Sequence, residues 1–179
     1  DIESLADDAL LSMAALLDEC DAAVTRLRSE TPLRAKCDRK MITQVIVNLL
    51  DNAVKYSAGK PEIIVRSFSR EGRVFLSIRD HGIGIKEEEK ERIFEELYRS
   101  SHERVKEVKG TGLGLAIVKK IMEDHGGTVS ARPAEGGGDE KTLTHLGPGF
   151  RYEPTWSPDG KKLVFIDQAM KIHVTNRAT

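Results

Sequence analysis

The chain has 179 residues, a net charge of −1, 32% charged and 39% hydrophobic residues, a composition typical of a soluble globular domain. This charge balance argues against nucleic-acid binding, and no apolar run reaches the roughly 20 residues that a membrane helix requires. Cys20 and Cys37 fit neither a metal-binding spacing nor a disulfide framework, and no signal peptide is recognisable. We therefore expect a cytoplasmic protein with two ordinary thiols.

The first half of the chain predicts a helix, a strand and a second helix. Leucine, alanine and methionine at helical spacing over residues 4–20 predict a helix with Ser4 as N-cap. Residues 22–30 alternate like a half-buried strand. Asp38 can cap the next helix, which is expected to run to about Tyr56. The apolar stripe of that helix consists of Ile42, Val45, Ile46, Leu49, Leu50 and Ala53.

The second half predicts a hairpin, a charged segment, a helix and further strands. Residues 61–80 read as a β-hairpin, and residues 86–109 carry mixed charge. The helix in "GLGLAIVKKIMEDHGG" is expected to end at Gly126 or Gly127. Residues 128–133 read as a strand and residues 134–140 as a linker. Beyond them, "FRYEPTWSPDGKKLVFIDQAMKIHVTN" predicts strands around a turn that contains Pro158 and Gly160.

A row of polar side chains runs along the helix that ends near Tyr56. Asn48, Asn52 and Lys55 lie close to one line on a helix surface, and Gln44 extends the row by a turn. Amide oxygens bind hard cations and lysine binds phosphate, so the row has the groups that a Mg²⁺–polyphosphate requires. A simple solvated helix face is the alternative interpretation.

Two glycine-rich segments accompany this row. "RDHGIGI" follows a strand directly, which puts Asp80 at the rim of the sheet, while Gly82 and Gly84 let the backbone approach a ligand. "KGTGLGLAIV" runs into a helix and directs free backbone N–H groups toward an anion. Neither segment has the spacing of a P-loop or of a dinucleotide-binding fingerprint.

Taken in order, "NLLDNAVKYS", "DHGIG", "RIFEELYR" and "GTGLGLAIVKKIMEDHGG" resemble the N, G1, F and G2 boxes of the sensor histidine kinase catalytic domain. This domain is the ATP-binding module of the gyrase, Hsp90, histidine kinase and MutL group. The resemblance covers about residues 1–135, and we expect the domain to span residues 1–138. It implies an α/β fold: a two-layer sandwich whose mixed, mostly antiparallel sheet is covered by helices, with a flexible lid at about 86–112.

The resemblance also implies a role for each matching residue. Asn52 would ligate Mg²⁺, Asn48 would help at the phosphates, and Lys55 would contact phosphate. Asp80 would hold the adenine amine, and Arg99 would reach the terminal phosphate. Asn48, Lys55 and Arg99 would thus be the catalytic residues. The other implied ATP contacts are Tyr56, Gly82, Gly84, Ile85, Phe94, Gly110, Thr111, Gly112, Leu113, Gly114 and Leu115.

The resemblance further implies phosphoryl transfer. The group's ATPases carry a glutamate that activates water at the place of Asn48, and an asparagine cannot act as a general base. The phosphoacceptor would be a histidine of a dimerisation domain, with a response regulator downstream. None of the five histidines, His81, His102, His125, His145 and His173, has the sequence context of that acceptor. We therefore expect a chain that does not autophosphorylate. A non-catalytic ATP-binding interaction module and a serine kinase of the anti-sigma type are the alternatives.

The sequence departs from the family pattern in two further places. His81 stands where the family usually has asparagine. "DEKTLTHL" (139–146) is only a weak substitute for the usual last strand. The following "YEPTWSPDGKKLVFI" resembles a repeat of the TolB and tricorn protease type of β-propeller, so residues 139–179 suggest an engineered fusion. Its Trp156, Phe165 and Ile166 would pack against the kinase domain or a second copy; disorder is the alternative.

Overall fold

The long helix α3 (Arg39–Lys55) lies at the centre of the helical layer. The computed structural model describes residues 1–70, 72–102, 105–106, 108, 110–134, 138–146, 155–156, 162–166 and 172–176. Asp38 caps α3, because its carboxylate accepts a hydrogen bond from the Met41 N–H at 3.0 Å. All six residues of the predicted apolar stripe are at most 1% exposed. The prediction for this helix is confirmed at both its cap and its buried face.

The N-terminal helix differs from its prediction. The structure has α1 (Ile2–Ser12) and α2 (Ala14–Glu19), separated at Met13. Asp1, and not Ser4, is the N-cap: its side chain accepts a hydrogen bond from the Ser4 N–H at 3.1 Å. Placing the cap at Ser4 was therefore wrong, because an equally good capping residue stands three positions earlier.

Five strands form the main sheet in the order β1-β2-β3-β5-β4. They are β1 (Ala23–Leu27), β2 (Glu62–Arg70), β3 (Arg73–Asp80), β4 (Thr128–Ala134) and β5 (Gly138–Leu146). β1 pairs with β2 in parallel and all other pairs are antiparallel, and α3 provides the crossover that parallel neighbours need. The expected mixed, mostly antiparallel sheet and the hairpin β2–β3 are both present.

β5 corrects the expectation for the end of the domain. Part of the segment expected to be a linker, Gly138–Glu140, belongs to this strand, which hydrogen-bonds to β3 on one side and β4 on the other. The sheet thus extends past the boundary that we expected after residue 138. The segment "DEKTLTHL", expected to be only a weak substitute for the last strand, forms most of β5.

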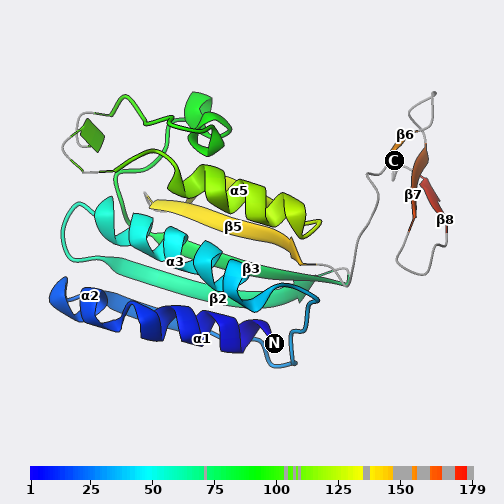
Figure 1. Cartoon of the computed structure of the whole chain (residues 1–179), viewed down its shortest axis with the longest axis horizontal. Helices are drawn as coiled ribbons and strands as arrows, with labels where there is room; N and C mark the ends of the chain where they lie inside the picture. Colours follow the sequence, from blue (N-terminus) through cyan, green and yellow to red (C-terminus); the bar gives the residue numbers. More distant parts are fainter. Residues whose placement is uncertain are drawn as a thin grey trace.

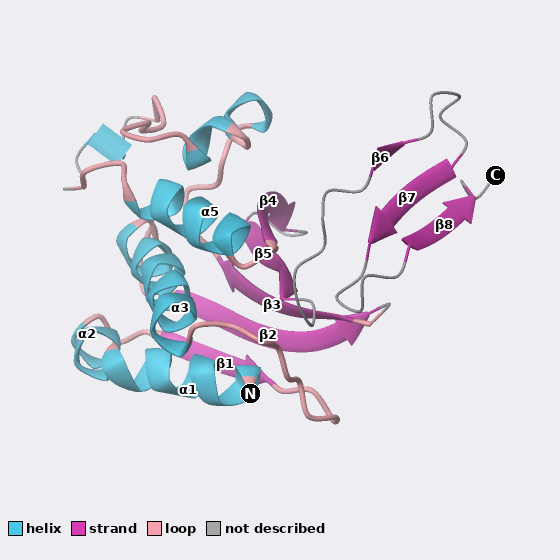
Figure 2. Cartoon of the chain, turned by 45° about the vertical axis from the view of Figure 1, so that its right-hand side comes forward, coloured by secondary structure: helices cyan, strands magenta, loops and turns pink. Residues whose placement is uncertain are grey.

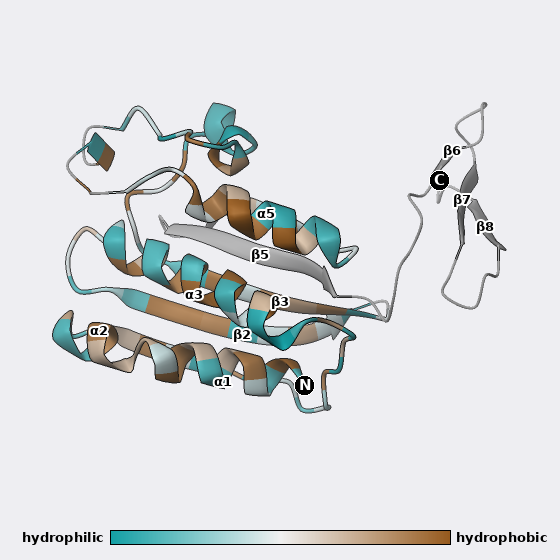
Figure 3. Ribbon diagram, viewed as in Figure 1, coloured by the Kyte–Doolittle hydropathy of each residue, from teal (hydrophilic) through white to brown (hydrophobic). Residues whose placement is uncertain are grey.

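The helices pack on one face of this sheet, as Figures 1 and 2 show for α1, α3 and α5 (Gly114–Asp124). Figure 3 shows brown, apolar colour along β2 and in bands on α3 and α5. The core between the two layers joins side chains from α1, α3, α5, β2 and β3. Its largest fully buried members include Ile2, Leu5, Leu49, Ile63 and Met122. The core therefore holds α3 and α5 side by side.

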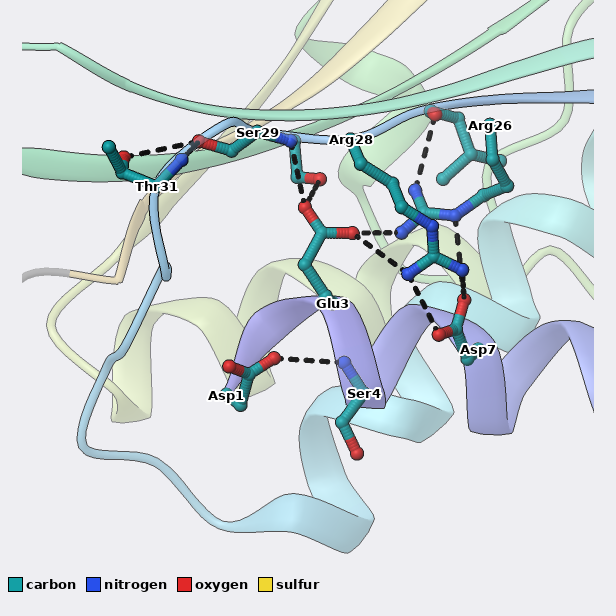
Figure 4. Close-up of polar contacts among 10 residues, drawn as sticks. Asp1, Glu3, Ser4, Asp7, Arg26, Arg28, Ser29 and Thr31 are labelled. Atoms are coloured by element: carbon teal, nitrogen blue, oxygen red, sulfur yellow. Dashed lines mark hydrogen bonds and ion pairs between the residues drawn. The ribbon is translucent and has the colours of Figure 1, made fainter.

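A charged network ties α1 to the neighbouring strands (Figure 4). The Glu3 carboxylate accepts hydrogen bonds from Arg26 at 2.5 Å, from the Ser29 N–H at 3.1 Å and from the Ser67 hydroxyl. Arg28 forms two hydrogen bonds to Asp7, at 2.9 and 3.0 Å. The side chains of Glu3 and Arg26 are only 17% and 14% exposed. α1 is thus held to β1 and β2 by polar contacts as well as by the core.

The charged segment after β3 forms two 3₁₀ turns, η1 (Glu87–Glu89) and η2 (Arg92–Phe94). Although this segment is rich in charge, Glu89, Ile93 and Phe94 are all buried. Ile93 and Phe94 form a second apolar cluster with Ala131, against Leu115 and Val129. The first part of the expected lid is therefore anchored on α5 and β4.

α5 ends where the glycines predict. His125 is its C-cap, and Gly126 adopts a φ of +65°. β6 (Thr155–Trp156), β7 (Lys162–Ile166) and β8 (Ile172–Asn176) form a separate antiparallel sheet. The predicted turn at Pro158 and Gly160 lies outside the described residues. None of the helices in the described part of the chain combines the length and the apolar character needed to span a membrane.

Candidate nucleotide site

A cavity of about 360 Å³ opens where α3 ends and α5 begins. Figure 1 shows both helix ends on the same side of the molecule, next to the segment between β3 and α5. The cavity is lined from α3, from the end of β3 and the loop after it, from the segment 93–105, and from the glycine-rich loop that enters α5. The four sequence motifs, far apart along the chain, thus converge on one cavity.

The polar row on α3 faces this cavity. Asn48, Asn52 and Lys55 all line it, whereas Gln44 is exposed and does not. The amide nitrogen Nδ2 of Asn48 is buried and has no hydrogen-bond partner within the described residues. An unsatisfied buried amide costs free energy, which a ligand with acceptor oxygens would recover. The simple solvated-face interpretation therefore does not hold for Asn48.

Lys55 is paired with an acidic residue of its own helix. The Asp51 carboxylate lies 2.5 Å from the Lys55 Nζ, one turn away, and Asp51 also lines the cavity. Both side chains are partly exposed, at 33% and 42%, so this pair is held only weakly. Lys55 can exchange Asp51 for an anion in the cavity. Asp51 was not predicted, although it follows Asn48 by three residues and so borders the same row.

Asp80 lies at the end of β3 and is only 5% exposed. One oxygen of its carboxylate, Oδ1, accepts a hydrogen bond from the Gly82 N–H at 3.0 Å. Gly82 does not line the cavity itself, but it contacts Asp80, which does. A Cβ at this position would lie 2.7 Å from Asp80 Oδ1 and 2.8 Å from the Tyr56 carbonyl oxygen. The close approach of the backbone that we expected here therefore holds Asp80 and Tyr56 together.

The second glycine-rich loop packs on the segment opposite. Gly112 adopts a φ of +74°, and a Cβ there would lie 2.9 Å from backbone atoms of Leu97 and Tyr98. α5 follows directly, and its N-cap residue Leu113 forms no capping hydrogen bond through its side chain. Backbone N–H groups at such a helix start are free to bind an anion. The predicted residues Gly110, Thr111, Gly112, Leu113, Gly114 and Leu115 all line the cavity.

Residues 98–100, together with Val105, form the remaining wall. Arg99 lines the cavity as predicted, and its guanidinium donates hydrogen bonds to the carbonyl oxygens of Val105 and Val108. Its neighbours Tyr98 and Ser100 line the cavity too, although neither was predicted. No spacing rule singles them out, because they are brought there by the fold of the lid.

The structure thus brings most of the predicted site together. Tyr56, Gly84 and Ile85 line the cavity along with the residues above, but Phe94 does not. Phe94 is buried in the second apolar cluster and supports the wall from outside. The remaining cavity residues that the sequence did not reveal are Ile83, Ile93, Val105 and Ile117. They are apolar and provide surface for a planar ring.

The donor set at the cavity fits a magnesium ion only in combination with a polyphosphate. Within the described residues, no group of three or more histidine, cysteine or acidic side chains is arranged to hold a metal. The cavity offers the amide groups of Asn48 and Asn52, whereas the Asp51 carboxylate is paired with Lys55. Mg²⁺ retains several waters and takes few protein ligands where phosphate oxygens supply the others. The unsatisfied Asn48 amide beside Asn52 agrees with such a site.

Comparison with known proteins gives a family match over residues 37–147, to the family described as "Histidine kinase-, DNA gyrase B-, and HSP90-like ATPase". The sensor histidine kinase YkoH of Bacillus subtilis is 45% identical over 111 residues, which cover 62% of this chain and 24% of YkoH. The sensor protein RprX of Bacteroides fragilis is 47% identical over 96 residues, which cover 52% of this chain and 18% of RprX. The chain therefore spans less than a quarter of either relative.

Solved structures agree with the sequence relatives. The mycobacterial sensor histidine kinase MprB superposes with a TM-score of 0.72 at 28% identity, over 84% of this chain and 97% of that one. Full-length ShkA in complex with AMPPNP gives a TM-score of 0.69 at 25% identity, over 83% of this chain and 31% of ShkA. The histidine kinase ThkA in complex with the response regulator TrrA gives a TM-score of 0.68 at 25% identity, over 81% of this chain and 40% of that one.

Proposed function

The chain belongs to the family of histidine kinase-, DNA gyrase B- and HSP90-like ATPases and carries the ATP-binding catalytic domain of a sensor histidine kinase, and we propose that it transfers the γ-phosphoryl group of ATP to a histidine on a separate dimerisation domain. A response regulator would receive the group next, since the relative ThkA forms a complex with its response regulator TrrA. This exchange would take place in the cytoplasm, where ATP is available.

The observation that carries this proposal is the convergence of the α3 polar row with the glycine-rich loop on one cavity. Asn48 and Asn52 would hold Mg²⁺ on the triphosphate, and the ion would supply the positive charge that offsets the negative charge on the leaving ADP. Lys55 would leave Asp51 for a phosphate oxygen, and Arg99 would exchange the lid carbonyls for the terminal phosphate. Asp80 would accept a hydrogen bond from the exocyclic amine of adenine, next to Tyr56.

The residues present favour transfer to a protein nucleophile over hydrolysis. In the transfer, the bond from the γ-phosphorus to the bridging oxygen would break and its electron pair would leave with ADP. The lone pair of an imidazole nitrogen would form the new bond to phosphorus, and the imidazole proton would pass to water. Asn48 has no basic group with which to activate water. The catalytic contribution of this chain would be orientation and charge neutralisation, as expected for phosphoryl transfer.

Calorimetric titration with ATP and Mg²⁺ tests nucleotide binding directly. We expect micromolar affinity, about −8 kcal/mol, and a loss of at least tenfold in Asn52→Ala and in Asp80→Asn. Gln44→Ala is the matched control, because Gln44 lies on the same helix but outside the cavity. Full affinity in both site variants, or equal losses in the control, would contradict the proposed site.

A phosphotransfer assay separates the alternatives. With a dimerisation domain of a matching kinase supplied in trans, we expect labelled phosphate that is stable in base and lost in acid, as phosphohistidine is. An acid-stable phosphoprotein would instead indicate a serine kinase. Binding of ATP without any transfer would indicate a non-catalytic interaction module.

We also propose that the segment after β5 is related to one β-propeller repeat. The antiparallel order β6-β7-β8 supports this relationship, and one such repeat lacks the neighbours that a propeller needs. A fusion of two unrelated genes would explain the combination with a kinase domain. Sequencing of the parent gene across the codons for residues 139–179 tests it: an uninterrupted native reading frame would exclude an engineered junction.

A further inference from the structure

Glu89 is a buried acidic residue in a segment that is otherwise rich in exposed charge. Its side chain belongs to η1 and is only 5% exposed, while its neighbours Glu87 and Glu88 are exposed. Burying a carboxylate is costly unless hydrogen bonds or a counter-charge compensate for it. No ion pair among the described residues includes Glu89, so its hydrogen bonds must provide most of the compensation.

Tyr98, Ser100 and Ser101 of the neighbouring segment supply those hydrogen bonds. The Tyr98 hydroxyl donates to Glu89 at 3.0 Å, the Ser100 hydroxyl at 2.8 Å and the Ser101 backbone N–H at 3.1 Å. Burial acts to raise the pKa of Glu89, but these hydrogen bonds and the charge of Lys86 outweigh it, so the pKa lies below its ordinary value of 4.5. Glu89 is therefore ionised at neutral pH.

The residues held in this way form one wall of the cavity. Tyr98 and Ser100 both line it, and Arg99 stands between them with its side chain in the same cavity. The Tyr98 ring is fixed from a second side by the Arg92 guanidinium, 4.5 Å from the ring centre. One carboxylate thus holds the side chains on both sides of Arg99 and the backbone N–H of Ser101. Glu89 does not line the cavity itself.

We propose that Glu89 is a positioning residue of the nucleotide site, whose hydrogen bonds to Tyr98, Ser100 and Ser101 hold the Arg99 guanidinium where it meets the phosphates of ATP. This inference rests on the proposed function. Neutralising Glu89 removes a charged acceptor from the hydroxyl and N–H donors, and the segment around Arg99 then samples other positions. We expect the affinity for the phosphates of ATP to fall, because the Arg99 guanidinium contributes its charge to phosphate binding.

The test compares Glu89→Gln with Glu88→Gln in the full chain. Glutamine keeps the size of the side chain, and Glu88 is the exposed neighbour that makes none of these contacts. Calorimetry with ATP and Mg²⁺ is set beside calorimetry with adenosine, which has no phosphate for Arg99 to bind. We expect Glu89→Gln to weaken ATP binding about tenfold, or about 1.4 kcal/mol, and adenosine binding less than twofold. Glu88→Gln should match the wild type for both ligands.

Combining Glu89→Gln with Arg99→Ala gives a double-mutant cycle. If Glu89 acts through Arg99, adding Glu89→Gln to Arg99→Ala causes no further loss of ATP affinity. Tyr98→Phe and Ser100→Ala each remove a single donor to Glu89 and should each give a smaller, ATP-selective loss. If Glu89→Gln lowers the yield of folded protein, these two variants still test the inference without changing Glu89.

Three results would overturn the inference while leaving the proposed function intact. They are unchanged ATP affinity in Glu89→Gln, equal losses for ATP and adenosine, and full additivity with Arg99→Ala. A wild-type chain that binds no ATP would instead overturn the proposed function, and this inference with it.

Discussion

Two polar residues of α3 show how the cavity is prepared for an anionic ligand. Asn48 leaves its amide nitrogen buried without a partner in the described part of the chain, and Lys55 has a partner that it can exchange. The first arrangement costs free energy that binding recovers, and the second keeps a cation near the cavity without exposing it fully. The free protein thus has a buried hydrogen-bond donor without an acceptor. A bound anion would provide the acceptor, which favours binding.

Asp51 is expected to restrain Lys55 in the free protein. Replacing it by Asn removes both the ion pair and a negative charge that repels phosphate. We expect Asp51→Asn to bind ATP about two- to fivefold more tightly at low salt, with the gain reduced at high salt. Asp124→Asn is the matched control, because Asp124 pairs with Lys120 at the same helical spacing on α5 and does not line the cavity.

Calorimetry at two salt concentrations measures this effect. Weaker ATP binding in Asp51→Asn would contradict the restraining role and would instead identify Asp51 as a ligand of the metal–nucleotide.

Gly82 is expected to tolerate no side chain. Gly82→Ala would place a methyl group within 2.8 Å of the Tyr56 carbonyl oxygen and closer still to Asp80. Because both belong to the cavity, we expect a loss of about 1–3 kcal/mol in the free energy of unfolding and weaker ATP binding. Urea denaturation and calorimetry measure the two effects.

Gly59→Ala provides the comparison for Gly82→Ala, since a Cβ at Gly59 meets nothing within 4 Å. It should leave ATP affinity unchanged and the free energy of unfolding within about 0.5 kcal/mol. Equal behaviour of the two variants would exclude the steric argument.

At the scale of elements, α1 depends on the charged network with β1 and β2 (Figure 4). Arg26→Met preserves the aliphatic stem and leaves the Glu3 carboxylate without its nearest cation. Removing one partner of a buried pair costs about 3–5 kcal/mol. Because both side chains retain some exposure, we expect a loss of about 2 kcal/mol in the free energy of unfolding, measured by urea denaturation.

Lys60→Met is the matched control for Arg26→Met. Lys60 pairs with Asp21 at 2.7 Å, but the two side chains are 54% and 84% exposed. Such a surface pair contributes little, so we expect a change below about 0.5 kcal/mol. An equally small loss in Arg26→Met would mean that the network contributes no more than a surface pair.

The elements differ in how far the sequence could predict them. α3 and α5 carry a cap or a terminating glycine together with a clear apolar stripe, so local physics specifies them. Helical spacing likewise indicated the polar row on α3, but the roles of its residues were implied only by the resemblance to the histidine kinase domain. Tyr98 and Ser100 could not be found, because they reach the cavity through a contact with Glu89 that no periodicity records.

β5 shows a second limit of prediction from sequence. "GDEKTLTHL" is polar and opens with glycine, and both features are depleted in strands. Its backbone is nevertheless paired on both sides, with β3 and with β4. β4 is its neighbour in the sequence, but β3 ends more than 50 residues earlier, so the residues of β5 alone predict the strand only weakly.

At the scale of the molecule, the position of β5 predicts how the chain can be shortened. A chain that ends at Leu146 retains the five-stranded sheet, so we expect it to bind ATP with the affinity of the full chain. A chain that ends at Glu135 lacks β5, which leaves β4 without its sheet neighbour. We expect this shorter chain to unfold or aggregate.

Circular dichroism and calorimetry on the two truncated chains measure this difference. Loss of ATP binding in the chain that ends at Leu146 would mean that the C-terminal segment is required for the nucleotide site. Equal stability of both chains would contradict the central role of β5.

The strand order also has a consequence for biosynthesis. α5 and β4 leave the ribosome before β5, yet among the described strands β4 pairs only with β5. Until residue 146 has left the exit tunnel, the helix that begins with the glycine-rich loop therefore lacks its final support. Translation proceeds at about 5–20 residues per second. During that time α5 and β4 have been synthesised but lack β5. The nascent protein thus acquires its nucleotide pocket in one late step, after nearly the whole domain has been synthesised.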